Sequence, residues 1–202
     1  MSDDMEITLP DMVDISAEAV QQAEASLDPS VPPPSYARKD TDKKTGDEIF
    51  RWNDNLLIEH TERKRAKSGL TVFYVRAKIR PNGEAENKSV GKKINCNYRI
   101  NFKVVAGTED NEGHKIMNHL STRSLLSLLK ATGFAPKDSA GGLPVSLLAA
   151  LFPLESDAFV SPLVGKVAVG NVVNRPNKQA TEERYKRQTE VESWLPAPTE
   201  LS

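Results

Sequence analysis

The stretch from Leu70 to Arg80, LTVFYVRAKIR, sets the character of the predicted fold. Successive side chains of a β-strand point to opposite faces, so this stretch separates into two kinds of surface. One face is apolar and carries Phe73, Val75, Ala77 and Ile79; the other is cationic and carries Tyr74, Arg76, Lys78 and Arg80. The alternation predicts a strand that covers a core on one side and exposes positive charge on the other.

A second run, INCNYRINFKVV from Ile94 to Val105, repeats this pattern. Its predicted inward side chains are Ile94, Cys96, Tyr98, Ile100, Phe102 and Val104, and its predicted outward ones are Asn95, Asn97, Arg99, Asn101 and Lys103. A face of cations, amides and one aromatic ring with almost no acid suits a nucleic-acid backbone and unstacked bases. We therefore expect both strands to contribute to one binding surface.

The charge of the chain is divided unevenly along its 202 residues. Residues 1 to 30 hold eight acids and no Lys or Arg, although the whole chain has a formal net charge of only −1. The rest therefore carries +7, and from residue 60 to 103 twelve Lys or Arg stand against three acids. An acidic arm joined to a basic body indicates a nucleic acid or another charged partner.

The order of the predicted elements suggests a fold class. After a disordered acidic and proline-rich arm at 1 to 46, a body at 47 to 196 contains three strands, a helical insert at 118 to 153 and two more strands, before a short tail at 197 to 202. This is the element order of the five-stranded OB-fold barrel, whose strands 2 and 3 and two of whose loops bind oligonucleotides. The sequence thus predicts a mainly β protein with a helical insert and an OB-fold-like barrel.

Cations gather in two segments that an OB-fold would use as binding loops. We expect residues 62 to 69 and 174 to 183 to close over a bound strand, with Tyr74 and Tyr185 available to stack on bases. Trp52 and Trp194 are predicted to pack in the body instead. The predicted nucleic-acid-binding residues are Arg63, Lys64, Arg65, Lys67, Tyr74, Arg76, Lys78, Arg99, Lys103, Lys166, Arg175, Lys178, Arg184, Tyr185, Lys186 and Arg187.

Three segments, NYRINF at 97 to 102, STRSLLSLLKATGF at 121 to 134 and PLVGKVAVGNVVNR at 162 to 175, resemble bacteriophage-encoded single-stranded DNA-binding proteins of the OB-fold type. The resemblance covers roughly residues 48 to 196. It implies a protein that coats and protects single-stranded DNA during replication or recombination, with little sequence preference and with replication or recombination proteins as further partners. Many members end in an acidic tail, whereas this chain ends in WLPAPTELS and carries its acid at the other end.

Other readings stay open at this stage. The acidic arm is a solubilising tail, a docking peptide or an internal mimic of DNA, and in the second case the chain is an interaction protein that binds a replication or host enzyme. A third alternative is an accessory to a metal-dependent nuclease. The three histidines lack zinc-site spacing, and no nucleotide or hydrolase motif occurs, so we expect no enzyme, metal or cofactor.

The remaining expectations concern compartment and assembly. The single cysteine, Cys96, cannot form an internal disulfide, which fits a reducing compartment. No secretory signal or membrane-spanning run is apparent, so we expect a cytoplasmic protein, in the host cell if it is phage-encoded. The sequence leaves the oligomeric state open.

Overall fold

Antiparallel pairing to one long strand organises the fold. The computed structural model describes residues 31 to 65, 70 to 83, 87 to 136, 145 to 154, 159 to 178 and 186 to 198. β2 (Glu48–Arg65) pairs with β5 along its first half and with β3 along its second half. The six-stranded sheet has the order β4-β3-β2-β5-β6, with β1 paired to β2, and its other strands are β1 (Arg38–Thr41), β3 (Leu70–Arg80), β4 (Lys93–Asn101), β5 (Val167–Pro176) and β6 (Arg187–Pro196).

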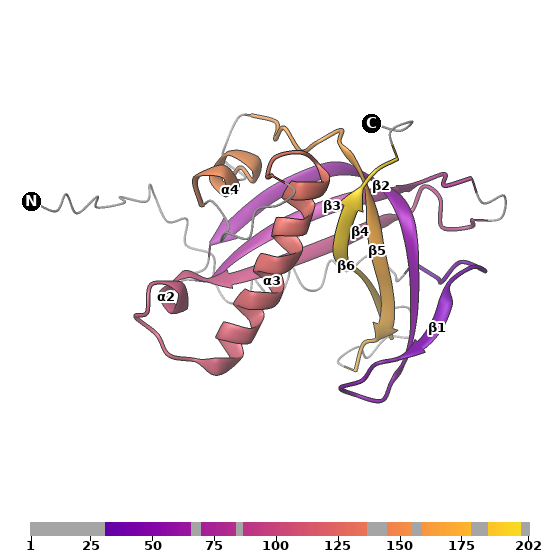
Figure 1. Ribbon diagram of the computed structural model, residues 1–202, viewed down its shortest axis with the longest axis horizontal. Helices are drawn as coiled ribbons and strands as arrows, with labels where there is room; N and C mark the ends of the chain where they lie inside the picture. The colour runs from indigo at the N-terminus through magenta and orange to yellow at the C-terminus, as the bar shows by residue number, and fades with distance from the viewer. Residues whose placement is uncertain are drawn as a thin grey trace, which may run out of the picture.

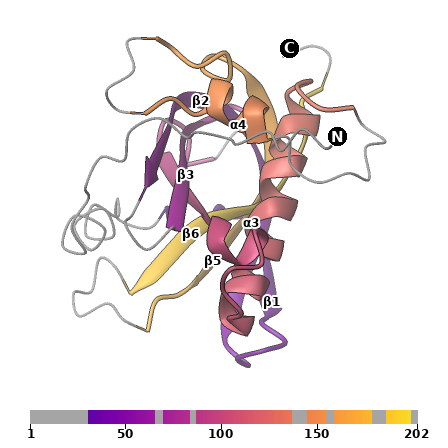
Figure 2. The same cartoon turned by 90° about the vertical axis from the view of Figure 1, so that its left-hand side faces the viewer.

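The sheet curls until its two edge strands, β4 and β6, come into contact (Figures 1 and 2). The Trp194 indole nitrogen on β6 donates a hydrogen bond to the Tyr98 hydroxyl on β4 at 2.8 Å. Strand pairing does not continue across this seam, so the sheet is not closed into a barrel. Instead the helix α3 (Glu112–Ala131) packs against both edge strands.

A polar stripe on α3 explains how the open seam is stabilised. Asn118 accepts a hydrogen bond from the Asn101 backbone N–H at 2.7 Å and donates one to its carbonyl at 3.0 Å. Ser121 accepts from the Arg99 N–H on the same strand, while Ser124 and Ser127 bond backbone groups of β6. Buried backbone N–H and C=O groups need hydrogen-bond partners. Because the edges of β4 and β6 do not pair with each other, the side chains of α3 supply these partners.

The apolar faces predicted from strand alternation form the core. Phe73, Val75, Ala77 and Ile79 on β3 are buried, as are Ile94, Cys96, Tyr98 and Ile100 on β4. α4 (Val145–Leu151) adds Leu148 and Leu151, and Phe152 beyond it meets Phe73 edge to face at 5.3 Å. Trp52 and Trp194 are buried too, so their expected role in packing is confirmed.

The predicted third strand is too long at its end. It stops at Asn101, and α2 (Phe102–Val105) follows, where the expectation was a strand to Val105. The buried Asn101 side chain accepts a hydrogen bond from the Lys103 backbone N–H and so caps this short helix. Lys103 is therefore an exposed helical residue and not part of the face of the sheet.

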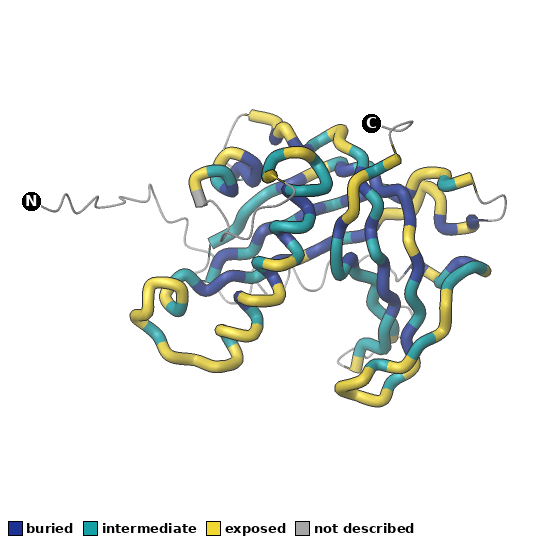
Figure 3. Tube along the Cα trace, in the orientation of Figure 1, coloured by how far each residue is buried: buried dark blue, intermediate teal, exposed yellow. Residues whose placement is uncertain are grey.

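The helical insert also begins earlier than predicted. α3 starts at Glu112, because Asn111 accepts a hydrogen bond from the His114 N–H and serves as its N-cap. The first part of α3 and the connection from α2 are largely exposed, as Figure 3 shows.

Residues 31 to 46, expected to belong to the arm, pack on the sheet and form β1. Val31 is buried, and its carbonyl accepts hydrogen bonds from Asn174 and Thr189. The Tyr36 hydroxyl donates to the buried Asp54 carboxylate at 2.6 Å. Residues 1 to 30 of the predicted arm lie outside the described residues.

Among the helices that the structure describes, none is both long and apolar enough to cross a membrane.

Candidate nucleic-acid interface

The solvent-facing side of β2, β3 and β4, here called the outer face, holds the centre of the predicted site. Directly opposite residues of antiparallel strands point to the same face. Tyr74 lies opposite Asn97 and Arg76 opposite Asn95, so cations and amides alternate across the two strands. The remaining neighbouring pairs are Val72 with Arg99 and Lys78 with Lys93.

Tyr74 is the centre of a small polar cluster on the outer face. Its hydroxyl donates to the Asn95 side-chain oxygen at 2.6 Å and accepts from Arg76 Nε at 3.1 Å. The Arg76 guanidinium also lies 5.7 Å from the centre of the Tyr74 ring, and the His60 ring is 5.9 Å away. These contacts hold the ring in place, while the described hydrogen bonds of Arg76 involve only Nε, so its terminal nitrogens stay available to a ligand.

Two carboxylates that the sequence analysis did not place also belong to the outer face. Glu59 lies 3.3 Å from Lys93 and 4.0 Å from Lys78, and Glu62 lies 2.9 Å from Lys64. The three lysines of these pairs are 37 to 46% exposed, so the pairs remain open to solvent and are partly screened by salt. The face keeps an excess of positive charge, since its described cations are Lys64, Arg76, Lys78, Lys93 and Arg99.

The cations near the end of β2 do not all share this face. β2 continues as a strand to Arg65, so the first half of the expected loop at 62 to 69 is strand, and residues 66 to 69 lie outside the described residues. Arg63 lies opposite the buried Phe73 and Arg65 opposite the buried Thr71, which places both arginines on the inward register. Only Lys64 of these three points outward with Tyr74 and Arg76.

The predicted cations of β5 and β6 are engaged by the protein itself. Arg175 lies 2.8 Å from both Glu190 and Glu192, and Lys178 lies 2.9 Å from Asp47. Arg187 donates to the backbone carbonyls of Glu48 and Asn174, and its guanidinium lies 5.1 Å from the Phe50 ring centre. We therefore assign Arg175 and Arg187 to the internal structure of the sheet, whereas the Lys178 side chain, beyond the end of β5, remains 66% exposed.

Two further predicted residues, Lys166 and Lys186, lie just before strands of the sheet. Lys166 is exposed just before β5, where its carbonyl accepts from the Ile58 N–H. Lys186 is exposed just before β6, where its carbonyl accepts from the Asn177 N–H. Lys67, Arg184 and Tyr185 lie outside the described residues.

A groove of about 610 Å³ adjoins the outer face at the seam between β4 and β6. We call the turn after β1 and the middle of α3 its rims, because the lining residues Lys43, Lys44 and Arg123 in these two elements are exposed, and we call the lining residues on the strands its floor. Its floor includes Asn97 of β4, Asn171 of β5 and Ser193 of β6. Asn97 belongs to both surfaces, because it also lies opposite Tyr74, so the groove and the outer face are continuous.

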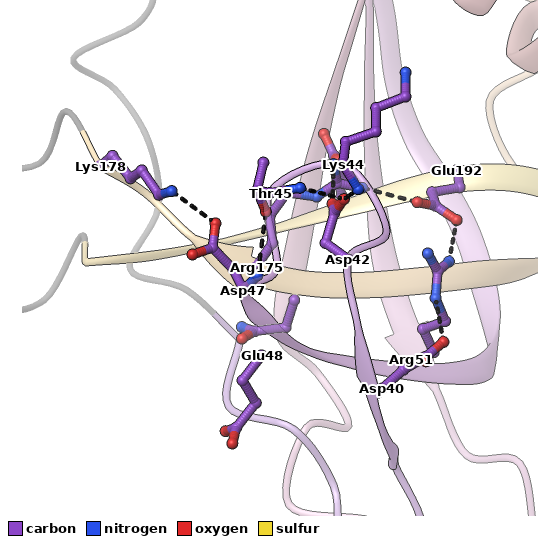
Figure 4. Close-up of polar contacts among 12 residues, drawn as sticks. Asp40, Asp42, Lys44, Thr45, Asp47, Glu48, Arg51, Arg175, Lys178 and Glu192 are labelled. Atoms are coloured by element: carbon purple, nitrogen blue, oxygen red, sulfur yellow. Dashed lines mark hydrogen bonds and ion pairs between the residues drawn. The ribbon is translucent and has the colours of Figure 1, made fainter.

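Carboxylates outnumber arginines in the floor of the groove, where the two kinds of side chain form a network of ion pairs (Figure 4). Arg51 lies 3.3 Å from Asp40 and also forms an ion pair with Glu192. Glu192 forms a second ion pair with Arg175. The Thr41 backbone N–H and then the nearby arginines lower the pKa of Asp40, whereas burial raises the pKa of Glu190. Four carboxylates of the groove, Asp40, Asp42, Glu190 and Glu192, thus stand against the two arginines of the floor, so any attraction for an anion comes from the cations of the rims.

Sequence reasoning missed several residues of these surfaces. The alternation pattern could have predicted Lys93 as an outward residue, because β4 begins one residue earlier than the predicted strand. Lys43, Lys44 and Arg123 line the groove but come from a turn and a helix that no strand pattern connects.

No group of three or more His, Cys, Asp or Glu side chains that could hold a metal ion occurs in the described segments. No known protein family matches this chain, and comparisons with curated proteins and with solved structures find no match either.

Proposed function

We propose that this chain is a non-enzymatic protein that binds single-stranded DNA through its outer face, with little sequence preference. The observation that carries the proposal is the shared orientation of Tyr74, Arg76, Lys78, Lys93 and Arg99 on two paired strands. Phosphates would pair with the cations, and Tyr74 would stack on a base, a contact typically worth about 1 to 3 kcal/mol. As the family resemblance implies, the protein would coat strands exposed during replication or recombination.

The arrangement of the strands supports an OB-fold as the scaffold. β2, β3 and β4 come first, α3 follows, and β5 and β6 come last, as expected for the five strands and the helix of that fold. The curled sheet brings β4 next to β6, the position at which a barrel would close. In this proposal α3 takes over the part of the closure that backbone pairing does not supply.

Charge-reversing substitutions on the outer face test the function. We expect Arg76→Glu combined with Lys78→Glu to lower the affinity for a labelled single-stranded oligonucleotide at least tenfold in low salt. Each lost phosphate contact should also reduce the slope of log K against log salt by about 0.7. Titrations with single-stranded and duplex DNA over a salt series measure both quantities, and the intact chain should prefer the single strand.

The matched control reverses two cations on β1, Arg38→Glu with Lys39→Glu. Both side chains are largely exposed, at 77% and 69%, and neither belongs to the outer face or lines the groove. This variant changes the net charge equally and should bind nearly as tightly as the parent chain. Equal affinities for the outer-face variant and the parent would move the site elsewhere.

A further inference from the structure

The groove differs from the outer face in where its unpaired cations lie. Arg51 and Arg175 in the floor are both engaged by carboxylates. By contrast, Lys43, Lys44 and Arg123 on the rims form no ion pair within the part of the chain that the structure describes. All three are exposed.

These free cations come from both rims. Lys43 and Lys44 belong to the turn between β1 and β2, and Arg123 belongs to α3 on the other side. Figure 4 shows the Lys44 ammonium pointing away from the ion pairs of the floor. A ligand lying along the groove would therefore meet positive charge at its margins, with ion-paired carboxylates and arginines and neutral polar groups beneath it.

The floor offers groups that suit base edges. Asn97, Asn171 and Ser193 contribute amides and a hydroxyl, and Asn171 lies directly opposite Ser193 on the neighbouring strand. Asparagine amides can donate and accept hydrogen bonds at base edges, whereas lysine and arginine pair with phosphates. The distribution matches a single strand whose bases face inward and whose phosphates face the rims.

We propose that the bound strand leaves the outer face at Asn97 and continues along the groove, where Lys43, Lys44 and Arg123 hold its phosphates. This inference rests on the proposed function and extends it, because it assigns the strand a second contact segment. The outer face alone serves a short oligonucleotide, and a longer one engages both segments. Asn97 and Asn171 are then the residues through which bases in the groove are contacted.

The test compares two oligonucleotide lengths on the full-length chain, about 5 and about 16 nucleotides, which span the usual range of site sizes for one OB-fold. Lys43→Glu with Lys44→Glu should weaken binding of the longer strand about tenfold. Two lost contacts should lower its salt slope by about 1.4. Binding of the shorter strand should stay within about twofold of the parent, because it occupies only the outer face.

Arg123→Glu on the opposite rim provides an independent variant. It should weaken binding of the longer strand but not of the shorter one, and it should lower the salt slope of the longer strand by about 0.7. Arg38→Glu with Lys39→Glu is again the control, since it alters the same hairpin outside the groove. Thermal melting of each variant checks its folding, and exposed cations without ion pairs should tolerate the change.

The outcomes separate the two proposals. If outer-face substitutions weaken binding and rim substitutions leave both lengths unaffected, the groove assignment is overturned and the proposed function stands. Equal weakening of both lengths by the rim variants would also overturn the assignment of a second segment. No binding of any oligonucleotide by the parent chain would overturn both.

Discussion

At the scale of single residues, Asp54 shows how a buried carboxylate is accommodated with neutral partners. Its side chain accepts hydrogen bonds from the Tyr36 hydroxyl, the Trp52 indole and the amides of Asn82 and Asn87, at 2.6 to 3.0 Å. The residue is 1% exposed, and the burial raises its pKa above the ordinary value, although the hydrogen bonds oppose that shift. This cluster joins the segment before β1 to β2 and to the connection between β3 and β4.

Replacing Asp54 should destabilise the protein in a way that depends on its hydrogen bonds. Asp54→Ala leaves several buried donors without an acceptor, each costing about 1 to 3 kcal/mol, so we expect a loss of about 3 kcal/mol or more. Asp54→Asn, the matched control, keeps one acceptor oxygen and should cost less. Urea denaturation measures both free energies of unfolding, and similar losses in the two variants would refute this role for the carboxylate.

The raised pKa of Asp54 also predicts a dependence on pH. At pH values above 3.8, the pKa of Asp54 in the unfolded chain, the native state keeps the Asp54 proton to a higher pH than the unfolded chain does. The free energy of unfolding of the parent should therefore fall, relative to Asp54→Asn, as the pH rises from about 4 through the native pKa. A constant difference between the two proteins across that range would contradict the shift.

The residue scale also shows why the charge of the outer face was predicted only in part. Alternation alone located Tyr74, Arg76, Lys78 and Arg99, because β3 and β4 pair regularly there. The register of β2 shifts between Ile58 and His60, and a bulge of this kind cannot be read from a periodic pattern. Glu59 was missed for that reason, and Glu62 was missed because residues 62 to 69 were expected to form a loop.

At the scale of elements, α3 has two roles, packing on the core and hydrogen bonding to strand edges, and its amphipathic pattern predicts only the first. Leu125, Leu128 and Leu129 of α3 pack on the core, as their helical spacing predicts. Its polar stripe, from Asn118 to Ser127, bonds the backbone of two strand edges, a role that depends on tertiary position and has no local sequence signal. Likewise, the end of β4 depends on a cap by Asn101 that strand alternation hides.

Removing one member of this stripe should weaken the seam between β4 and β6. Asn118→Ala leaves the Asn101 backbone N–H and carbonyl without their side-chain partner, so we expect a loss of about 2 kcal/mol in the free energy of unfolding. Hydrogen exchange should also become faster at the Asn101 amide. His119→Ala, at an exposed neighbouring position, is the control and should change stability by less than about 0.5 kcal/mol.

Equal stability of Asn118→Ala and His119→Ala would contradict this role of α3. It would mean that water or another side chain hydrogen bonds with the Asn101 backbone in place of Asn118.

At the scale of the whole molecule, two surfaces of different origin meet at Asn97. The outer face comes from regular pairing of β3 with β4, so its main cations were predictable from the sequence. The groove joins a turn, a helix and three strands that lie far apart in the chain, so only the fold reveals it. The mainly β class and a helical insert before the last two strands were likewise predictable, whereas α2, the sixth strand and the open seam were not.

The central claim is that one continuous surface, from the outer face through Asn97 into the groove, receives a single strand. Amide chemical-shift mapping on the isotope-labelled full-length chain tests it most directly, with an oligonucleotide of about 16 nucleotides as the ligand. We expect the largest shifts along β3 and β4 near Tyr74 and Asn97, together with shifts at Lys43, Lys44 and Arg123. Shifts that cluster on α4 or around Arg38, with none on β3, would contradict it.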